Sequence, residues 1–180
     1  MDLLTGLTER RSIRHYTDQS VSEQEIKKIL ETARFAPSWK NSQTARYYVI
    51  LNPELKNRIA EEGTLDFSKN KWNIQNAPAL IVLTSMKNSS GYNPDGSFTT
   101  SKNTHWESFD AGIAAQTFCL SAYANGFGTL IMGIFDEQQI AEILKLPESE
   151  TVSALIALGH AAEIPDAPTR HEPDEILKIF

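Results

Sequence analysis

The stretch that most constrains the fold is 106–125, which predicts a long helix with almost no polar face. Along one stripe, mostly apolar residues recur at helical spacing, namely Phe109, Ile113, Thr117, Leu120 and Ala124. Alanines fill much of the remaining surface. A helix that is apolar nearly all round is buried on most sides, and a chain of 180 residues has difficulty in covering it alone. We therefore favour a homodimer, since two-fold pairs are the commonest oligomers, over a central helix covered entirely by its own sheet.

Composition argues against several classes of protein. The formal net charge of -6 disfavours a nucleic-acid binder, which is usually basic. No apolar run approaches the roughly 20 residues of a membrane span, and the first residues do not fit a signal peptide. The single cysteine, Cys119, allows no internal disulfide and does not indicate an oxidising compartment. We expect one cytoplasmic domain over residues 1–180, with neither nucleic acid nor membrane as a partner.

Hydrophobic spacing, capping residues and helix breakers divide the chain into elements. Ser22 and Glu25 match a capping box at the start of a helix that Pro37 would end. Helices are expected at 2–9, 22–36, 53–62, 106–125 and 136–144, and strands at 47–51, 79–84, 130–134 and 152–158. The polar stretch 85–104 predicts a long loop, of the kind that serves as a lid or binding loop or is disordered.

The sequence offers no pattern for metal or nucleophilic catalysis. None of the four histidines pairs with another at ligand spacing, and there is no cysteine cluster, so no metal site is expected. There is no GxSxG motif. The GxG at 126–128 follows a helix instead of a strand, so it is typical of a helix C-cap and not of a dinucleotide fingerprint.

The clearest candidate for binding chemistry is the segment RRSIRHY at 10–16. Arginine presents a fixed fork of donors that matches the oxygens of a phosphate. In an extended segment, Arg10, Ser12 and Arg14 would project to one side. Ile13 could then anchor the other side in the core. The alternative is a solvated basic patch that pairs with neighbouring acids.

A second polar segment, APSWKNSQ at 36–43, leaves a helix and runs towards a strand. Its Ser, Asn and Gln side chains gather donors and acceptors within a few residues. Such a set could bind the edge of a pyrimidine-like ring, where acceptors alternate with N–H groups. The alternative is an ordinary polar turn between a helix and a strand.

Taken in order, five segments of the chain resemble the nitroreductase family of flavoproteins. RRSIRHY lies near the N-terminus, and APSWKNSQ follows one helix later. Asn76-Ala77-Pro78 precedes a buried strand, and the long Ala-rich helix ends in NGFGTLIMG. LPESETVSALIALGHAAEIP comes near the end of the chain, before Arg170. The order of the segments is more specific than any one of them.

This resemblance implies an α+β fold, with a mixed, largely antiparallel sheet flanked by helices in an intertwined homodimer. It implies one FMN at each end of the dimer interface, touched by both chains, and NADH or NADPH as the electron donor. Arg10, Arg170 and Ser12 would hold the phosphate, and Arg14 would lie near the flavin N1 and O2 edge. The full set of implied cofactor-binding residues is Arg10, Arg11, Ser12, Arg14, Asn70, Thr129, Leu130, Ile131, Met132, Gly133 and Arg170, with Pro37, Ser38, Asn41 and Gln43 from the partner chain.

Two features depart from better-known members of the family. An asparagine, Asn73, stands where a lysine commonly faces the flavin ring, whereas Asn70 keeps the expected amide. Few residues follow Arg170, so only 172–180 are expected to form the arm that wraps the partner subunit.

The implied activity is a ping-pong transfer of electrons from NAD(P)H to a nitroaromatic, a quinone or a similar small acceptor. The flavin N5 would carry the chemistry, so no catalytic side chain is expected. Other activities remain open: specialised chemistry within the family (dehalogenation, flavin breakdown or ring dehydrogenation), a flavin-binding sensor or storage protein with little turnover, and a phosphate-binding module without flavin.

Overall fold

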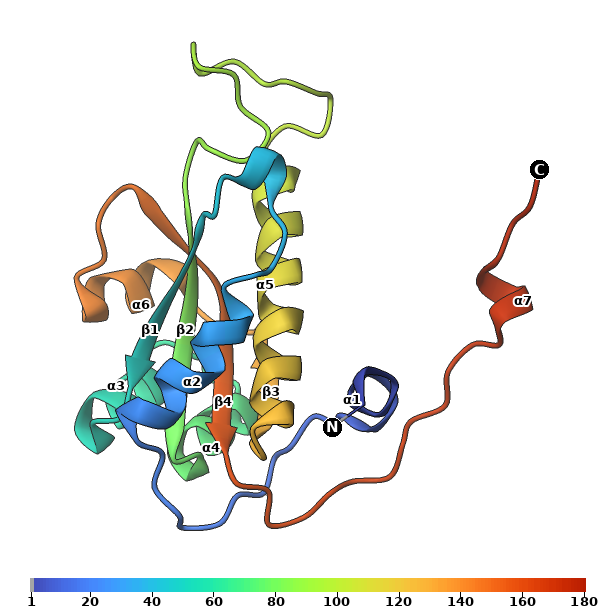
Figure 1. Cartoon of the computed structure of the whole chain (residues 1–180). Helices are drawn as coiled ribbons and strands as arrows, with labels where there is room; N and C mark the ends of the chain where they lie inside the picture. Colours follow the sequence, from blue (N-terminus) through green and yellow to red (C-terminus); the bar gives the residue numbers. More distant parts are fainter. Residues whose placement is uncertain (1) are drawn as a thin grey trace.

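The computed structural model describes residues 2–180 and is built around a four-stranded sheet with the strand order β1-β2-β4-β3 (Figure 1). The strands are β1 (Ala45–Ile50), β2 (Ala79–Met86), β3 (Gly128–Met132) and β4 (Glu150–Gly159). All three strand pairings are antiparallel. An isolated parallel bridge joins Ser12 to Thr129 beside β3. The fold class is α+β with a largely antiparallel sheet, which confirms the prediction from the sequence.

Helices cover both faces of the sheet and make three layers. One face is covered by α2 (Glu23–Ala33) and α5 (His105–Ala124), and the other by α3 (Pro53–Glu62), α4 (Ser68–Asn76) and α6 (Glu137–Leu144). The short α1 (Leu3–Glu9) lies beside α5, and α7 (Pro173–Ile176) belongs to a C-terminal arm. A single 3-10 turn, η1 (Trp39–Asn41), precedes β1.

The central strand β2 anchors both layers because both of its faces are covered. Its residues from 79 to 85 are all buried. Ile81 and Leu83 belong to the core cluster under α2 and α5, whereas Leu80 and Val82 belong to the cluster under the other helices. This division follows the alternation of side chains along a strand. Each such side chain contributes about 1.5–3 kcal/mol on burial.

Helix ends follow local sequence signals, with one correction. The capping box of Ser22 and Glu25 forms as predicted. The helix was expected to run to residue 36, but α2 ends at Ala33. The N–H groups of Phe35 and Ala36 donate to the carbonyls of residues 32 and 33, each three residues back, so the last turn tightens before Pro37. The strand expected at 130–134 is also shifted, because β3 pairs with β4 from Gly128 onward.

Beyond Ala162 the chain leaves the body of the protein as an arm (Figure 1). The expectation that residues 172–180 of this arm wrap a partner subunit stays a prediction. Its large apolar side chains are exposed, and they are Ile164, Ile176, Leu177, Ile179 and Phe180. Apolar side chains gathered on an exposed segment are typical of a surface that another chain covers.

Stability should fall above pH 10 through Tyr47, whose ring stacks on Phe118 with 5.4 Å between centroids. Burial, with a smaller contribution from Cys119, raises the pKa of this phenol from 10.0 to about 12. The folded state holds the proton more tightly, so this stabilisation is present below pH 10 and is lost as the pH rises towards 12. Between pH 9 and pH 11, the parent should lose up to about 1 kcal/mol more in urea unfolding than Tyr47→Phe does. Equal losses would show that the folded state does not raise this pKa.

Candidate functional site

The segment 10–14 lies beside β3 and is fixed there by its one apolar side chain. Ile13 is 4% exposed, and its N–H donates to the carbonyl of Thr129 at 2.9 Å. Its side chain fills the space over Gly128, where a Cβ would lie 2.5 Å from Ile13 Cγ1. The hydroxyl of Tyr16 donates to the Ile13 carbonyl at 2.8 Å. Ile13 is therefore the anchor that the sequence predicted.

The three arginines of this segment face different surroundings. Arg10 is half-buried near the junction of α5 and β3, where burial raises the pKa of the Cys119 thiol and the charge of Arg10 acts against that rise. Arg11 lines a hollow of about 470 Å³ together with residues 126–128. Arg14 is exposed and lines a separate hollow.

The hollow at Arg14 has a volume of about 240 Å³ and lies at the outer edge of β3. Its remaining lining consists of Phe67, Lys69, Asn70, Asn73 and residues 130–134. Within residues 2–180, no strand continues the sheet beyond β3 past the bridge at Thr129. Backbone N–H and C=O groups on this edge are therefore available to a ligand. The hollow combines a guanidinium, two amides and a free backbone edge.

Two asparagines of α4 face this hollow although they are almost fully buried. Asn70 donates through Nδ2 to the carbonyl of Ile134 at 2.9 Å, which leaves its side-chain oxygen available. The amide of Asn73 makes no hydrogen bond to another residue among 2–180. The ammonium group of Lys56 donates to the carbonyl of Ala77 at the end of α4 and so holds the helix in place. Because an amide offers both donors and an acceptor and that of Asn73 lines the hollow, Asn73 is suited to a polar ligand.

The second polar segment folds into a strained turn at residues 38–43. Lys40, Asn41 and Gln43 have φ values of 46°, 58° and 50°. Residues other than glycine seldom adopt this left-handed region. The hydroxyl oxygen of Ser38 accepts the N–H of Gln43 at 2.9 Å across the turn. Such strain persists only where the surroundings hold it, and it is common at binding sites.

Asp110 on α5 holds this turn in place. Its carboxylate is buried and accepts hydrogen bonds from the N–H of Trp39, at 2.9 Å, and from the hydroxyl of Ser90. The hydroxyl oxygens of Ser90 and Ser42 lie 3.2 Å apart. Asp110 thus ties the turn and the base of the loop 87–104 to the same helix.

The site residues form two groups at opposite ends of α5 (Figure 1). The turn cluster, residues 37–43, meets the helix at Asp110. The β3 cluster consists of Arg10, Ser12, Arg14, Asn70, Asn73 and residues 129–133 around the end of α5. From Asp110 to Asn125 the helix rises by about 22 Å, at 1.5 Å per residue. One chain therefore does not bring both clusters onto one small ligand.

Arg170 belongs to neither cluster in this structure. It lies on the exposed arm, and among residues 2–180 its side chain has no hydrogen-bond or ion-pair partner. The resemblance implies that Arg170 and Arg10 bind the same phosphate, and this stays a prediction.

The family model described as the nitroreductase family matches residues 7–160. The chain belongs to the nitroreductase family. The NAD(P)H FMN reductase of Bacillus subtilis is 28% identical, over 90% of this chain and 67% of the relative. A nitroreductase family protein of Clostridium novyi NT matches with a TM-score of 0.77 and 28% identity, over 92% of this chain and 89% of that one. A Desulfovibrio desulfuricans protein solved in complex with FMN matches with a TM-score of 0.78 and 25% identity, over 99% and 97%.

Two further properties of this nitroreductase-family chain concern residues 2–180. None of their helices has the length and apolar character to span a bilayer. They also contain no group of three or more His, Cys, Asp or Glu side chains arranged to hold a metal ion.

The candidate site also contains residues that the sequence analysis missed. The helix α4 was not predicted, because its buried face is mostly the amides of Asn70 and Asn73 and its N-cap, Phe67, gives no capping signal. Asp110 was missed as well. The available signal was a lone acid in the interior of an otherwise apolar helix, which needs a partner when buried.

Proposed function

We propose that this protein is an FMN-dependent oxidoreductase that moves electrons from NADH or NADPH to a small organic acceptor, such as a nitroaromatic or a quinone, by a ping-pong mechanism. The observation that carries the proposal is the hollow at the outer edge of β3, with its guanidinium, buried amides and free backbone groups. Family membership supports it, as do the name of the Bacillus subtilis relative and the FMN bound to the Desulfovibrio desulfuricans protein.

The residues of the β3 cluster fit FMN in their chemistry. The amide of Asn73, almost buried and without a hydrogen-bond partner among residues 2–180, matches a ring edge rich in donors and acceptors. Arg10, Ser12 and Arg170 would hold the phosphate, Arg11 would add backbone contacts, and residues 129–133 would meet the ring through backbone groups.

In this proposal the chain binds and orients FMN, and FMN carries out the reaction. When bound, FMN supplies the electron-transfer chemistry itself, so the chain needs no acid, base or nucleophile. Arg14 would place positive charge at the edge of the ring where reduction adds negative charge. Asn70, fixed by its bond to Ile134, would hold a single orientation towards the ring.

We place each FMN between two chains of a homodimer. If two α5 helices pack side by side in opposite directions, the turn cluster of one chain meets the β3 cluster of the other. The outer face of α5 supports this pairing, because Phe109 is 57% exposed and lines an open groove with Ile113. Pro37, Ser38, Asn41 and Gln43 would then reach the FMN that the other chain holds.

The proposal treats residues 1–180 as one FMN-binding domain in the cytoplasm. The free thiol of Cys119 is compatible with a reducing compartment.

The phosphate assignment predicts weaker FMN binding in Arg10→Ala and in Arg170→Ala. Each variant loses a charge-assisted contact of about 1.5–3 kcal/mol, which corresponds to a dissociation constant roughly 10 to 150 times higher. Quenching of flavin fluorescence during titration of the apoprotein measures this constant. Arg58→Ala is the control, because Arg58 pairs with Glu62 on the surface of α3. Parent-like affinity in both variants would refute the phosphate assignment.

The oxidoreductase assignment is tested by the visible spectrum of the holoprotein under anaerobic conditions. NADH or NADPH should bleach the flavin bands in a stopped-flow experiment, and a nitroaromatic or quinone should restore them. A protein that binds FMN but keeps its colour with both donors would be a sensor or storage protein instead.

A further inference from the structure

A second hollow, of about 410 Å³, adjoins the one at the edge of β3. It is lined by Arg14, His15, Ser68, Lys69, Trp72 and Asn73. Arg14, Lys69 and Asn73 line both hollows. The second hollow, here called the Trp72 hollow, therefore opens beside the place where the proposed function puts the flavin ring.

The Trp72 hollow and its neighbour are positively charged in an acidic protein. Among the described residues that line the two hollows there is no Asp or Glu. Within residues 2–180, Arg14 and Lys69 form no ion pair, whereas Lys71, two residues further along α4, pairs with Glu61. Two unpaired cations facing one hollow in a chain with a net charge of -6 attract an anionic ligand.

An aromatic surface lies beside these cations. Trp72 is 43% exposed, and its ring is held edge-on against His15 with 5.2 Å between centroids. A tryptophan fixed by a neighbour but open to a hollow offers a flat apolar surface to another ring. The amide of Asn73, unbonded within residues 2–180, lies at the boundary between the hollows and can bond to a polar group there.

We propose that the Trp72 hollow binds a negatively charged group carried by a flat aromatic molecule, with Lys69 as the charge partner and Trp72 as the packing surface. This inference rests on the proposed function, because it concerns what approaches the flavin. Two sources share the chemistry: the carboxylate of an aromatic electron acceptor and the phosphates of the dinucleotide donor.

The acceptor arm of the test compares 4-nitrobenzoate with neutral 4-nitrobenzamide at saturating NADH. Lys69→Gln should lower kcat/KM for the benzoate by about fivefold, as expected for losing one charge contact near water, and leave the benzamide within twofold. Raising the salt concentration should reduce the preference of the parent for the anion. Lys28→Gln, on the exposed side of α2, is the matched control and should behave as the parent does.

The donor arm measures flavin bleaching by NADH and NADPH in the same variants. If Lys69→Gln slows bleaching by about fivefold and leaves both acceptors unchanged, the anion is a phosphate of the donor. Trp72→Leu should weaken whichever ligand depends on Lys69, because that ligand loses its packing surface.

Direct binding separates this inference from the proposed function. Calorimetric titration with benzoate and benzamide requires neither turnover nor flavin, so it remains informative if the protein proves colourless. The parent should bind benzoate more tightly than benzamide, and Lys69→Gln should remove the difference. A difference that is absent in the parent or unchanged in Lys69→Gln, together with Lys69-independent kinetics in both arms, would overturn the inference.

Discussion

Replacing Asp110 by alanine should destabilise the protein by about 3 kcal/mol and weaken FMN binding in the same variant. The carboxylate accepts from the N–H of Trp39 and from the hydroxyl of Ser90, and both donors would be left without a partner in a buried setting. The turn at residues 38–43 would lose the contact that holds its strained backbone. Urea unfolding of the apoprotein measures the first effect, and FMN titration measures the second.

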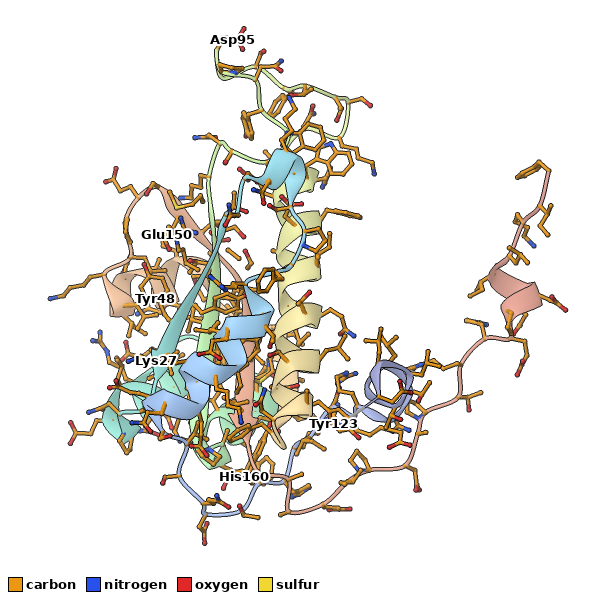
Figure 2. The ribbon with its side chains drawn as sticks, viewed as in Figure 1. Lys27, Tyr48, Asp95, Tyr123, Glu150 and His160 are labelled. Atoms are coloured by element: carbon orange, nitrogen blue, oxygen red, sulfur yellow. The ribbon has the colours of Figure 1, made fainter. Side chains whose placement is uncertain are left out.

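Two control variants define this prediction. Both bonds end on Oδ2, and Asp110→Asn keeps an oxygen that can accept them without the negative charge, so it should lose roughly half as much stability. Asp95→Ala removes an acid at the tip of the loop 87–104, far from the turn (Figure 2). The Asp95 carboxylate accepts hydrogen bonds only from within that loop. An Asp110→Ala protein as stable as Asp95→Ala, with FMN bound as in the parent, would show that Asp110 does not hold the turn.

The substitution Gly128→Ala should have the second-largest effect on stability and FMN binding. The new Cβ would lie 2.5 Å from Ile13 Cγ1 and 2.8 Å from Ile13 Cβ, so the anchor of segment 10–14 must move. Overpacking of this kind costs about 1–3 kcal/mol. The folded variant should also bind FMN more weakly than the parent, because Arg10 and Arg14 shift with the segment.

A double-mutant cycle with Ile13→Ala isolates this contact. Ile13→Ala removes the 2.5 Å contact with Cγ1 but keeps the one with Cβ, so Gly128→Ala should cost about 1 kcal/mol less in the Ile13→Ala background than in the parent. Additive costs would mean that the two residues do not meet as described.

The parts of the fold that the sequence predicted are those with a local physical signal. Ser22 and Glu25 satisfy each other at the start of α2, and the unbroken apolar run of β2 reflects burial on both faces. The segment 10–14 was predictable because arginines and a hydroxyl flank one apolar anchor, Ile13. These features depend on residues that are neighbours in the sequence, so the sequence alone predicts them.

The features that were missed depend on tertiary contacts. The left-handed backbone of Lys40, Asn41 and Gln43 has no glycine to signal it, because distant contacts from Asp110 and Ser90 hold the turn. The helix α4 turns amides inward, so its pattern shows no apolar stripe. The Trp72 hollow joins residues from segment 10–16 and α4, and sequence spacing gives no sign of that meeting.

The account rests on each FMN site being built from the β3 cluster of one chain and the turn cluster of the other. Mixed dimers of Arg10→Ala chains with Asn41→Gly chains test this most directly, since glycine removes the amide but keeps the left-handed backbone. In such a dimer one site carries both changes and the other carries neither. We predict that purified mixed dimers bind one FMN with the affinity of the parent, although both variant homodimers bind weakly. Mixed dimers in which both sites are as weak as those of the homodimers would contradict the shared site.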